Sequence, residues 1–298
     1  MPDHNTLYDC IIIGAGPGGL QAAIHLARYN RRVLLLDRGG GRTNHARHIV
    51  NYLGIREISG QALIETGLAQ LEYFGVEVAV TPVVRVTKEE NFRILTAEHA
   101  FQARFVIAST GAVDNQPSLK HLGRFLGEGY YTCIDCDGHQ TTGKNLLVMG
   151  NNLNAPRLAL AMQQMYTERV SLLISDYSVP DDYATVLKEN NIPLTMGRPV
   201  ELLGHDILEG VRLADGKDMA CEAIMATFGW RLNDGYLKDL QLDRDHEGFK
   251  ILASPAGQSS LRGLYVVGAL RPGHAQAIIA AGQGAAAAID INGQLLDL

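Results

Sequence analysis

The stretch "IIIGAGPGGL", residues 11–20, decides the fold of the N-terminal part of this 298-residue chain. Gly14, Gly16 and Gly19 stand in the order G-x-G-x-x-G, directly after an apolar strand and directly before a helix expected from about Pro17 to Tyr29. The first glycine makes a tight turn, the second lets the backbone approach a pyrophosphate, and the third lets helix and strand pack closely. The pattern predicts a dinucleotide-binding β-α-β unit.

An acid closes the second strand of this unit. Asp37 ends "RVLLLD", about twenty residues after the first glycine, where a carboxylate accepts hydrogen bonds from an adenosine ribose. This spacing is the same for NAD and for FAD, so the residues alone do not distinguish the two cofactors.

The same pattern begins again near residue 144. "NLLVMG" has the character of a strand, Ala155–Tyr166 of a helix and "RVSLLIS" of a second strand, while "GLYVVGAL" and an alanine-rich helix from His274 complete the first unit. We therefore predict an α/β protein of two Rossmann-like dinucleotide-binding domains, the second inserted in the first. The expected ranges are 1–116 with 247–298 for the first domain and 117–246 for the inserted one.

Charge and composition argue against several classes of protein. The net charge is −6 and no basic run is present, so we expect no nucleic-acid partner. The start "MPDHNTLYDC" lacks the basic region of a secretory signal, and glutamines interrupt the most apolar long stretch, Ala275 to Ile289. We expect a cytoplasmic protein, with peripheral association with a membrane left open.

Two cysteines three positions apart are followed by an acid in "YTCIDCDGH", residues 131–139. Cys133 and Cys136 could form a catalytic redox pair, half of a zinc site or two inert core thiols. A zinc site needs two more nitrogen or sulfur ligands, and no second Cys-x-x-Cys or His-x-x-x-His follows, so no metal is expected. The spacing suits a disulfide that opens and closes, with one thiol as nucleophile and the other resolving the mixed disulfide. This favours the redox pair over the inert thiols.

Several motifs together resemble a known family. "GAGPGGLQAAI", "ASTGA" (108–112), "TFGW" (227–230) and "GLYVVGAL" (263–270) fall in the order seen in flavoprotein disulfide reductases. The chain resembles the low-molecular-weight thioredoxin reductases, whose Cys-x-x-Cys-Asp motif lies in the inserted domain. The resemblance implies FAD in the first domain, a homodimer, and exchange of electrons among flavin, disulfide and a thioredoxin-like protein or small dithiol.

The resemblance also implies roles for residues. Cys136 is expected to face the flavin, Cys133 the external thiol, and Asp137 to exchange protons with the thiols. Cys10 and Cys221 lie in apolar strand patterns and are expected in the core. The residues expected to bind FAD are Gly14, Gly16, Pro17, Gly19, Asp37, Arg38, Arg42, Asn51, Thr110, Gly111, Gly268, Gln276 and Ala277.

The second glycine loop departs from the reductase pattern. It reads "GNNLNAP", with Asn152 and Ala155 at the second and third glycine places, where a side chain crowds the phosphates. Asp176, Asp181 and Asp182 follow the next strand and would repel the 2′-phosphate of NADPH. We therefore expect an electron partner other than NADPH.

Relatives that lack these motifs include ferredoxin-linked thioredoxin reductases, fungal dithiol oxidases and cyanobacterial diflavin-linked disulfide oxidoreductases, which hold a second FAD. Our hypothesis places the chain with the diflavin-linked group. The alternatives are an NAD(P)H- or ferredoxin-dependent thioredoxin reductase and a non-catalytic flavin-binding redox sensor. The external electron donor or acceptor is not identified by the sequence.

A second departure lies at Ala269. The resembling reductases carry an aspartate here that holds the ribityl chain of the flavin, whereas "VVGAL" has no carboxylate. Backbone amides at the start of the last helix, near Gln276 and Ala277, are then expected to hold the cofactor.

Overall fold

The computed structural model describes residues 6–297 and shows two compact units. The first unit holds the described residues up to Val113 and those from Arg231 on, and the second holds Asp114–Trp230. The chain passes from the first unit to the second in β7 (Ala112–Asp114) and returns in β16 (Trp230–Leu232).

The return to the first unit comes earlier in the chain than the sequence indicated, at 230–231 instead of 246–247. The physical reason is packing. Tyr236 and Leu237 are buried in the core of the first unit, and Leu232, Leu240 and Leu242 pack against it. Residues 231–246 therefore belong to the first unit.

The first unit is built on a seven-stranded sheet with the order β3-β2-β1-β6-β5-β4, in which β17 also pairs with β6. Strands β1, β2, β3, β6 and β17 run parallel, and β4, β5 and β6 form an antiparallel meander. The elements of this unit are β1 (Leu7–Ile13), α1 (Pro17–Arg28), β2 (Val33–Asp37), the 3₁₀ turn η1 (Arg42–His45), α2 (Gly60–Tyr73), β3 (Glu77–Val80), β4 (Arg85–Lys88), β5 (Phe92–Leu95), β6 (Ala100–Ala108), the 3₁₀ turns η3 (Gly235–Leu237) and η4 (Gly268–Leu270), β17 (Leu264–Val266) and α7 (Ala277–Leu296).

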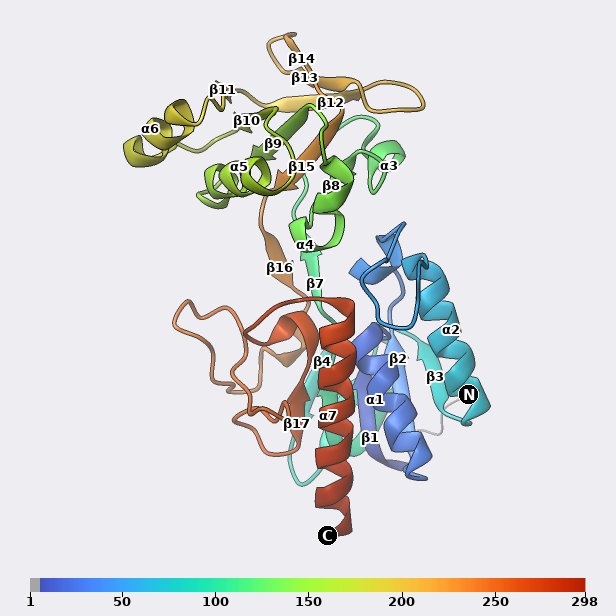
Figure 1. Cartoon of the computed structure of the whole chain (residues 1–298). Coiled ribbons are helices and arrows are strands. Elements are labelled where there is room, and N and C mark those ends of the chain that lie inside the picture. Colours follow the sequence, from blue (N-terminus) through green and yellow to red (C-terminus); the bar gives the residue numbers. More distant parts are fainter. Residues whose placement is uncertain (1–5, 298) are drawn as a thin grey trace. The chain divides into compact units, whose positions relative to one another are not determined.

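Side chains of β1 alternate between the two faces of this sheet. Cys10 and Ile12 lie in a buried cluster with residues of α1, α2 and α7, whereas Ile11 and Ile13 lie in a second cluster with the meander and the C-terminal loops. A strand buried on both faces is apolar throughout, as "CIII" is. Figure 1 shows α1, α2 and α7 beside this sheet.

The second unit repeats the architecture with five parallel strands in the order β11-β10-β9-β15-β8. A separate antiparallel sheet, β12-β13-β14, accompanies it. The elements are α3 (Leu122–Phe125), β8 (Tyr130–Tyr131), α4 (Ile134–Asp137), the 3₁₀ turn η2 (Gly138–Thr141), β9 (Leu146–Gly150), α5 (Asn154–Met165), β10 (Val170–Ile174), α6 (Asp181–Glu189), β11 (Leu194–Met196), β12 (Pro199–Leu203), β13 (Gly210–Leu213), β14 (Asp218–Ala220) and β15 (Ala223–Thr227).

Alternation along β9 divides the core of this unit as well. Val148 packs with the buried side of α5, and Leu147 and Met149 pack with residues of the small antiparallel sheet. The predicted α/β fold with two Rossmann-like units, the second inserted in the first, is thus confirmed. Within residues 6–297, no helix is both long and apolar enough to cross a membrane.

Candidate active site

The glycine loop between β1 and α1 has two glycines that the protein itself requires. Gly14 has φ +108°, and a Cβ there would meet the Ser109 carbonyl oxygen at 2.7 Å. A Cβ at Gly19 would lie 1.9 Å from the carbonyl oxygen of Gly14. These two residues hold the turn and the close packing of helix on strand.

Gly16 is different, because nothing in the protein demands it. Its φ is −71° and its ψ 174°, which any residue adopts, and a Cβ there would meet only the Ser109 carbonyl oxygen, at 3.9 Å. Within the described chain no side chain caps the N-terminus of α1, and Pro17 follows as its first residue. The open space and the uncapped helix start fit a phosphate group, which is the group that the sequence predicts here.

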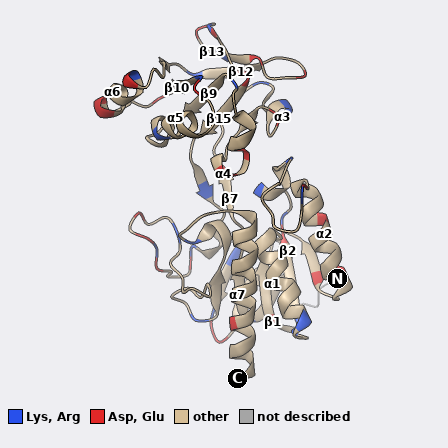
Figure 2. Cartoon of the chain, viewed as in Figure 1, with Lys and Arg blue, Asp and Glu red and all other residues tan. Residues whose placement is uncertain are grey.

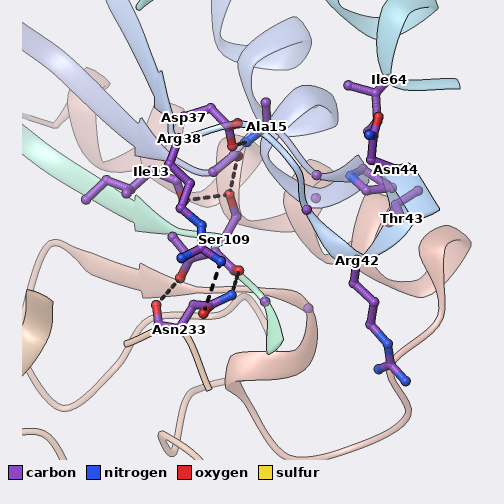
Figure 3. A pocket seen from close by; sticks show the side chains of 18 of the residues that line it. Ile13, Ala15, Asp37, Arg38, Arg42, Thr43, Asn44, Ile64, Ser109 and Asn233 are labelled. Carbon is purple, nitrogen blue, oxygen red and sulfur yellow. Dashed lines mark hydrogen bonds between the residues drawn. The ribbon is translucent and has the colours of Figure 1, made fainter. Parts of the chain in front are cut away.

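Asp37 holds the loop from β2. Its Oδ2 accepts a hydrogen bond from the Ala15 amide at 2.7 Å, and its Oδ1 accepts one from the Gly39 amide at 2.5 Å. Figure 3 shows Asp37 beside Ala15. Each carboxylate oxygen has a further lone pair, so the side chain can still accept hydrogen bonds from a ribose.

The loop opens into a cavity of about 760 Å³ that lies within the first unit. That volume suits a cofactor with many atoms. All but two of the residues predicted to bind FAD line it: Gly14, Gly16, Pro17, Asp37, Arg38, Arg42, Thr110, Gly111, Gly268, Gln276 and Ala277.

The two others contribute indirectly. Gly19 packs α1 against the loop, as described, and does not line the cavity. Asn51 does not line it either, but its Nδ2 donates to Oε1 of Gln276 at 3.2 Å and so orients a residue that does.

Sequence reasoning missed part of the wall. Leu232, Asn233, Gly235 and Tyr236 line the cavity, although the sequence assigned them to the inserted domain. Asn233 Nδ2 donates to the Thr110 carbonyl oxygen at 3.0 Å. Figure 3 shows Asn233 near Arg38, whose guanidinium donates to Asn233 Oδ1 at 3.4 Å. No sequence pattern indicates that these residues line the cavity, because only tertiary packing brings them back to the first unit.

In the second unit, Cys133 and Cys136 are joined by a disulfide with their Cα atoms 5.3 Å apart. Cys133 precedes α4, and its Sγ accepts a hydrogen bond from the Cys136 amide at 3.2 Å. Both cysteines and Asp137 are partly exposed, so an external thiol can reach them. This amide would stabilise a thiolate on Cys133, which forms when the mixed disulfide at Cys133 is released.

The residue after Asp137 is a glycine for a steric reason. A Cβ at Gly138 would lie 2.7 Å from Cε2 of the Tyr166 ring. The Tyr166 carbonyl oxygen also accepts a hydrogen bond from the Gly143 amide at 3.0 Å. Tyr166 thus supports the segment that follows the redox pair at two points.

The two remaining cysteines lie in the core, as the sequence predicts. Cys10 and Cys221 are buried free thiols. Burial raises the pKa of the Cys10 thiol far above its ordinary value, and burial raises the pKa of Cys221 to about 12. Both stay protonated at neutral pH, so neither competes with the redox pair.

In the second glycine loop, between β9 and α5, the Asn152 side chain makes hydrogen bonds within the protein. Asn152 Oδ1 accepts a hydrogen bond from the Asn154 amide at 2.9 Å, and its backbone carbonyl oxygen accepts one from the Ala155 amide at 3.1 Å. Its Nδ2 donates to the Thr227 carbonyl oxygen at 2.9 Å. The first two amides of α5 are therefore engaged within the protein, in contrast to the uncapped start of α1.

Three acidic residues follow β10. Asp176 is exposed in the loop that follows the strand, and Asp181 and Asp182 open α6. Figure 2 shows the acidic residues of α6 in red.

Fold and site together define a class of protein: a flavin-dependent disulfide oxidoreductase with a cofactor cavity in one Rossmann-like unit and a redox disulfide in the other. The chain belongs to the pyridine nucleotide-disulphide oxidoreductase family, whose model matches residues 8–284.

Several of the similar proteins are thioredoxin reductases. That of Treponema pallidum is 28% identical over 95% of both chains. The crystal structure of thioredoxin reductase from Streptococcus pyogenes has a TM-score of 0.91 and 26% identity, covering 99% of this chain and 100% of the other. The crystal structure of HlmI has a TM-score of 0.91 and 30% identity, covering 99% of this chain and 95% of that one. These similarities support FAD as the cofactor, and the space at Gly16 fits it.

Proposed function

We propose that the enzyme exchanges electron pairs between FAD, the Cys133–Cys136 disulfide and an external dithiol, and that it does so without NADPH. The observation that carries the proposal is the capture of the first two α5 amides by Asn152. A pyrophosphate binds at a helix start because unpaired amides point at it. At α5 it would first have to displace the Asn152 side chain.

Charge adds to this steric argument. The 2′-phosphate distinguishes NADPH from NADH and needs a cation near the end of the second strand. After β10 this chain carries Asp176, Asp181 and Asp182, and Arg157 of α5 is engaged with Tyr183 of α6. Like charges oppose binding of that phosphate, so the loop and the strand end disfavour the same ligand.

In the first unit, the proposed FAD site uses groups already described. The start of α1 at Gly16 and Pro17 would receive the pyrophosphate, and Asp37 the adenosine ribose. The start of α7, at Gln276 and Ala277, lines the same cavity. When bound, FAD supplies storage for an electron pair.

The thiol chemistry follows from the geometry of the pair. An external thiolate attacks Sγ of Cys133, the disulfide breaks, and Cys136 leaves as a thiolate. The partner's second thiol then attacks the mixed disulfide and releases Cys133, so the partner leaves oxidised and the pair holds two electrons and two protons. Asp137 takes and returns the proton of these thiols. Cys136 is the thiol that would face the flavin, and bound FAD would accept the electron pair that the two thiols hold. The reverse sequence reduces an external disulfide.

We propose one FAD per chain. The second FAD implied by resemblance to the diflavin-linked group would need a pyrophosphate site, and the start of α5 is engaged by Asn152. Acid release of flavin, measured against protein concentration, tests this: one flavin per chain supports the proposal, and two contradict it.

Anaerobic mixing tests the electron partner. The oxidised enzyme is mixed separately with NADPH and with a dithiol such as dithiothreitol, and flavin absorbance is followed. Bleaching by dithiol but not by micromolar NADPH supports the proposal, and rapid bleaching by micromolar NADPH contradicts it. The variant Asn152→Gly frees the Asn154 amide and leaves the acids of the second unit unchanged. Comparing it with the parent separates the effect of the loop contact on NADPH binding from the effect of the acids.

A second candidate is an NAD(P)H-dependent thioredoxin reductase, which the family's name, with its pyridine nucleotide, and the names of the Treponema pallidum and Streptococcus pyogenes proteins favour. NADPH-driven reduction of thioredoxin would establish it. Bleaching by reduced ferredoxin, together with thioredoxin reduction, would establish the ferredoxin-dependent alternative. A flavin that neither dithiols nor disulfides change at a useful rate would point to a redox sensor.

The proposed partner is a thioredoxin-like protein or a small dithiol, because the names of the relatives indicate thioredoxin and the pair is accessible. We also propose the homodimer that the resemblance implies. Light scattering on the FAD-loaded protein would give the mass of a single chain if that proposal is wrong.

A further inference from the structure

The hydroxyl group of Tyr236, in the wall of the cavity, uses its proton in a hydrogen bond within the protein. Tyr236 lines the cavity and is only 8% exposed. Its Oη lies 3.1 Å from Oγ1 of Thr110, which lines the same cavity. Either oxygen could in principle donate to the other, so a further contact has to decide the direction.

The decisive contact is made by Thr110. Its Oγ1 lies 2.6 Å from the carbonyl oxygen of Asn233, and a carbonyl oxygen can only accept. The single proton of Thr110 therefore goes to Asn233. At the Thr110–Tyr236 contact, Tyr236 must then be the donor, and its Oη keeps lone pairs with no proton to give.

The surroundings hold this arrangement in place. Asn233 donates through Nδ2 to the carbonyl oxygen of Thr110, and its backbone amide donates to that of Gly111 at 3.0 Å. Burial raises the pKa of Tyr236 well above its ordinary value, so the phenol keeps its proton at neutral pH. Tyr236, a residue of the cavity wall, thus carries a fixed hydrogen-bond acceptor.

Ala269 lies in the wall of the same cavity and offers no side-chain acceptor. The ribityl chain of FAD carries hydroxyl groups, each of which needs an acceptor when it leaves water. We propose that Tyr236 is a positioning residue for the cofactor, whose Oη accepts a hydrogen bond from a ribityl hydroxyl of FAD. The proposal rests on FAD binding and is independent of the electron partner.

The test is the dissociation constant of FAD for the oxidised protein, measured by fluorescence titration of the apoprotein. Tyr236→Phe keeps the ring and removes the acceptor. We expect the dissociation constant to rise about fivefold to tenfold, which is the effect of losing one hydrogen bond.

A matched control is available in Tyr8→Phe. Tyr8 is also buried in the first unit and donates one hydrogen bond from its hydroxyl, to Glu77 at 3.0 Å, but it does not line the cavity. This variant should bind FAD within about twofold of the parent. An equal loss in both variants would mean a general effect of removing a buried hydroxyl and would overturn the proposal.

A rescue variant gives the test a second arm. Ala269→Asp places an acceptor in the same cavity, and we expect the double variant to bind FAD more tightly than Tyr236→Phe alone. A Tyr236→Phe protein with the parent's affinity, or a double variant that gains nothing, would refute the proposal. No electron donor is present, so these results do not depend on whether NADPH reduces the enzyme.

Discussion

The contact between Gly138 and Tyr166 gives a prediction that can be worked out from distances. In Gly138→Ala, the new Cβ would lie 2.7 Å from Cε2, 2.9 Å from Cζ and 3.0 Å from Oη of the ring. Gly138 has φ −52° and ψ −39°, which alanine adopts freely, so the backbone adds no cost. The Tyr166 backbone is held by hydrogen bonds with Met162 and Gly143, so the ring can give way only by turning about its own side-chain bonds. Overpacking of this kind costs about 1–3 kcal/mol of unfolding free energy.

Urea unfolding, followed by the fluorescence of the single tryptophan, Trp230, measures this cost in the second unit. A double-mutant cycle with Tyr166→Ala shows whether the ring is the cause. In the Tyr166→Ala background, Gly138→Ala should lower the unfolding free energy by less than about 0.5 kcal/mol. The coupling free energy between the two substitutions should then be about 1–2 kcal/mol. With Tyr166→Phe, which keeps the ring, the cost should stay near that of the parent background. Strictly additive costs of Gly138→Ala and Tyr166→Ala would refute the reasoning.

Four further outcomes are expected. Gly16→Ala should leave the unfolding free energy within about 0.5 kcal/mol and still weaken FAD binding, because its Cβ enters space that only the cofactor needs; unchanged affinity would contradict this. Gly19→Ala should lower thermal stability even in the apoprotein, because its Cβ would overlap a carbonyl oxygen. Iodoacetamide at pH 8 should label the reduced redox pair quickly and spare Cys10 and Cys221 in the folded protein, as counted by mass spectrometry. The pKa of the Cys221 thiol is raised from 9.0 to about 12. The contribution of this buried thiol to stability is therefore present below pH 9 and lost as the pH rises towards 12. Asn152→Ala should destabilise the second unit by about 1–3 kcal/mol through the loss of its side-chain hydrogen bonds, and urea unfolding would show no change if those bonds do not form.

The first β-α-β unit could be predicted from sequence because its constraints are local. Gly14 needs its positive φ and Gly19 its close contact with the loop, and both requirements act within six residues of chain. The helix beginning at Pro17 was predicted correctly for the same reason. The alternation of β1 side chains between two buried clusters follows from its continuous apolar run between two packed layers.

Residues 231–246 could not be placed in this way. Tyr236 and Leu237 reach the core of the first unit through loops and a single 3₁₀ turn, where no helical or strand period marks burial. The cavity wall at Asn233 depends on hydrogen bonds to Thr110, more than a hundred residues earlier in the chain. For the second loop, the sequence indicated crowding by Asn152, and the structure shows hydrogen bonds to the amides of α5 instead.

The central claim is that electrons pass between FAD and the Cys133–Cys136 pair. The most direct test is anaerobic mixing of a dithiol with the FAD-loaded parent and with Cys133→Ser and Cys136→Ser, followed by flavin absorbance. Cys221→Ser, which alters a buried thiol outside the pair, is the control. We expect rapid bleaching in the parent and in Cys221→Ser, and little or none in the other two variants. Bleaching at the parent's rate in either variant of the pair would contradict it.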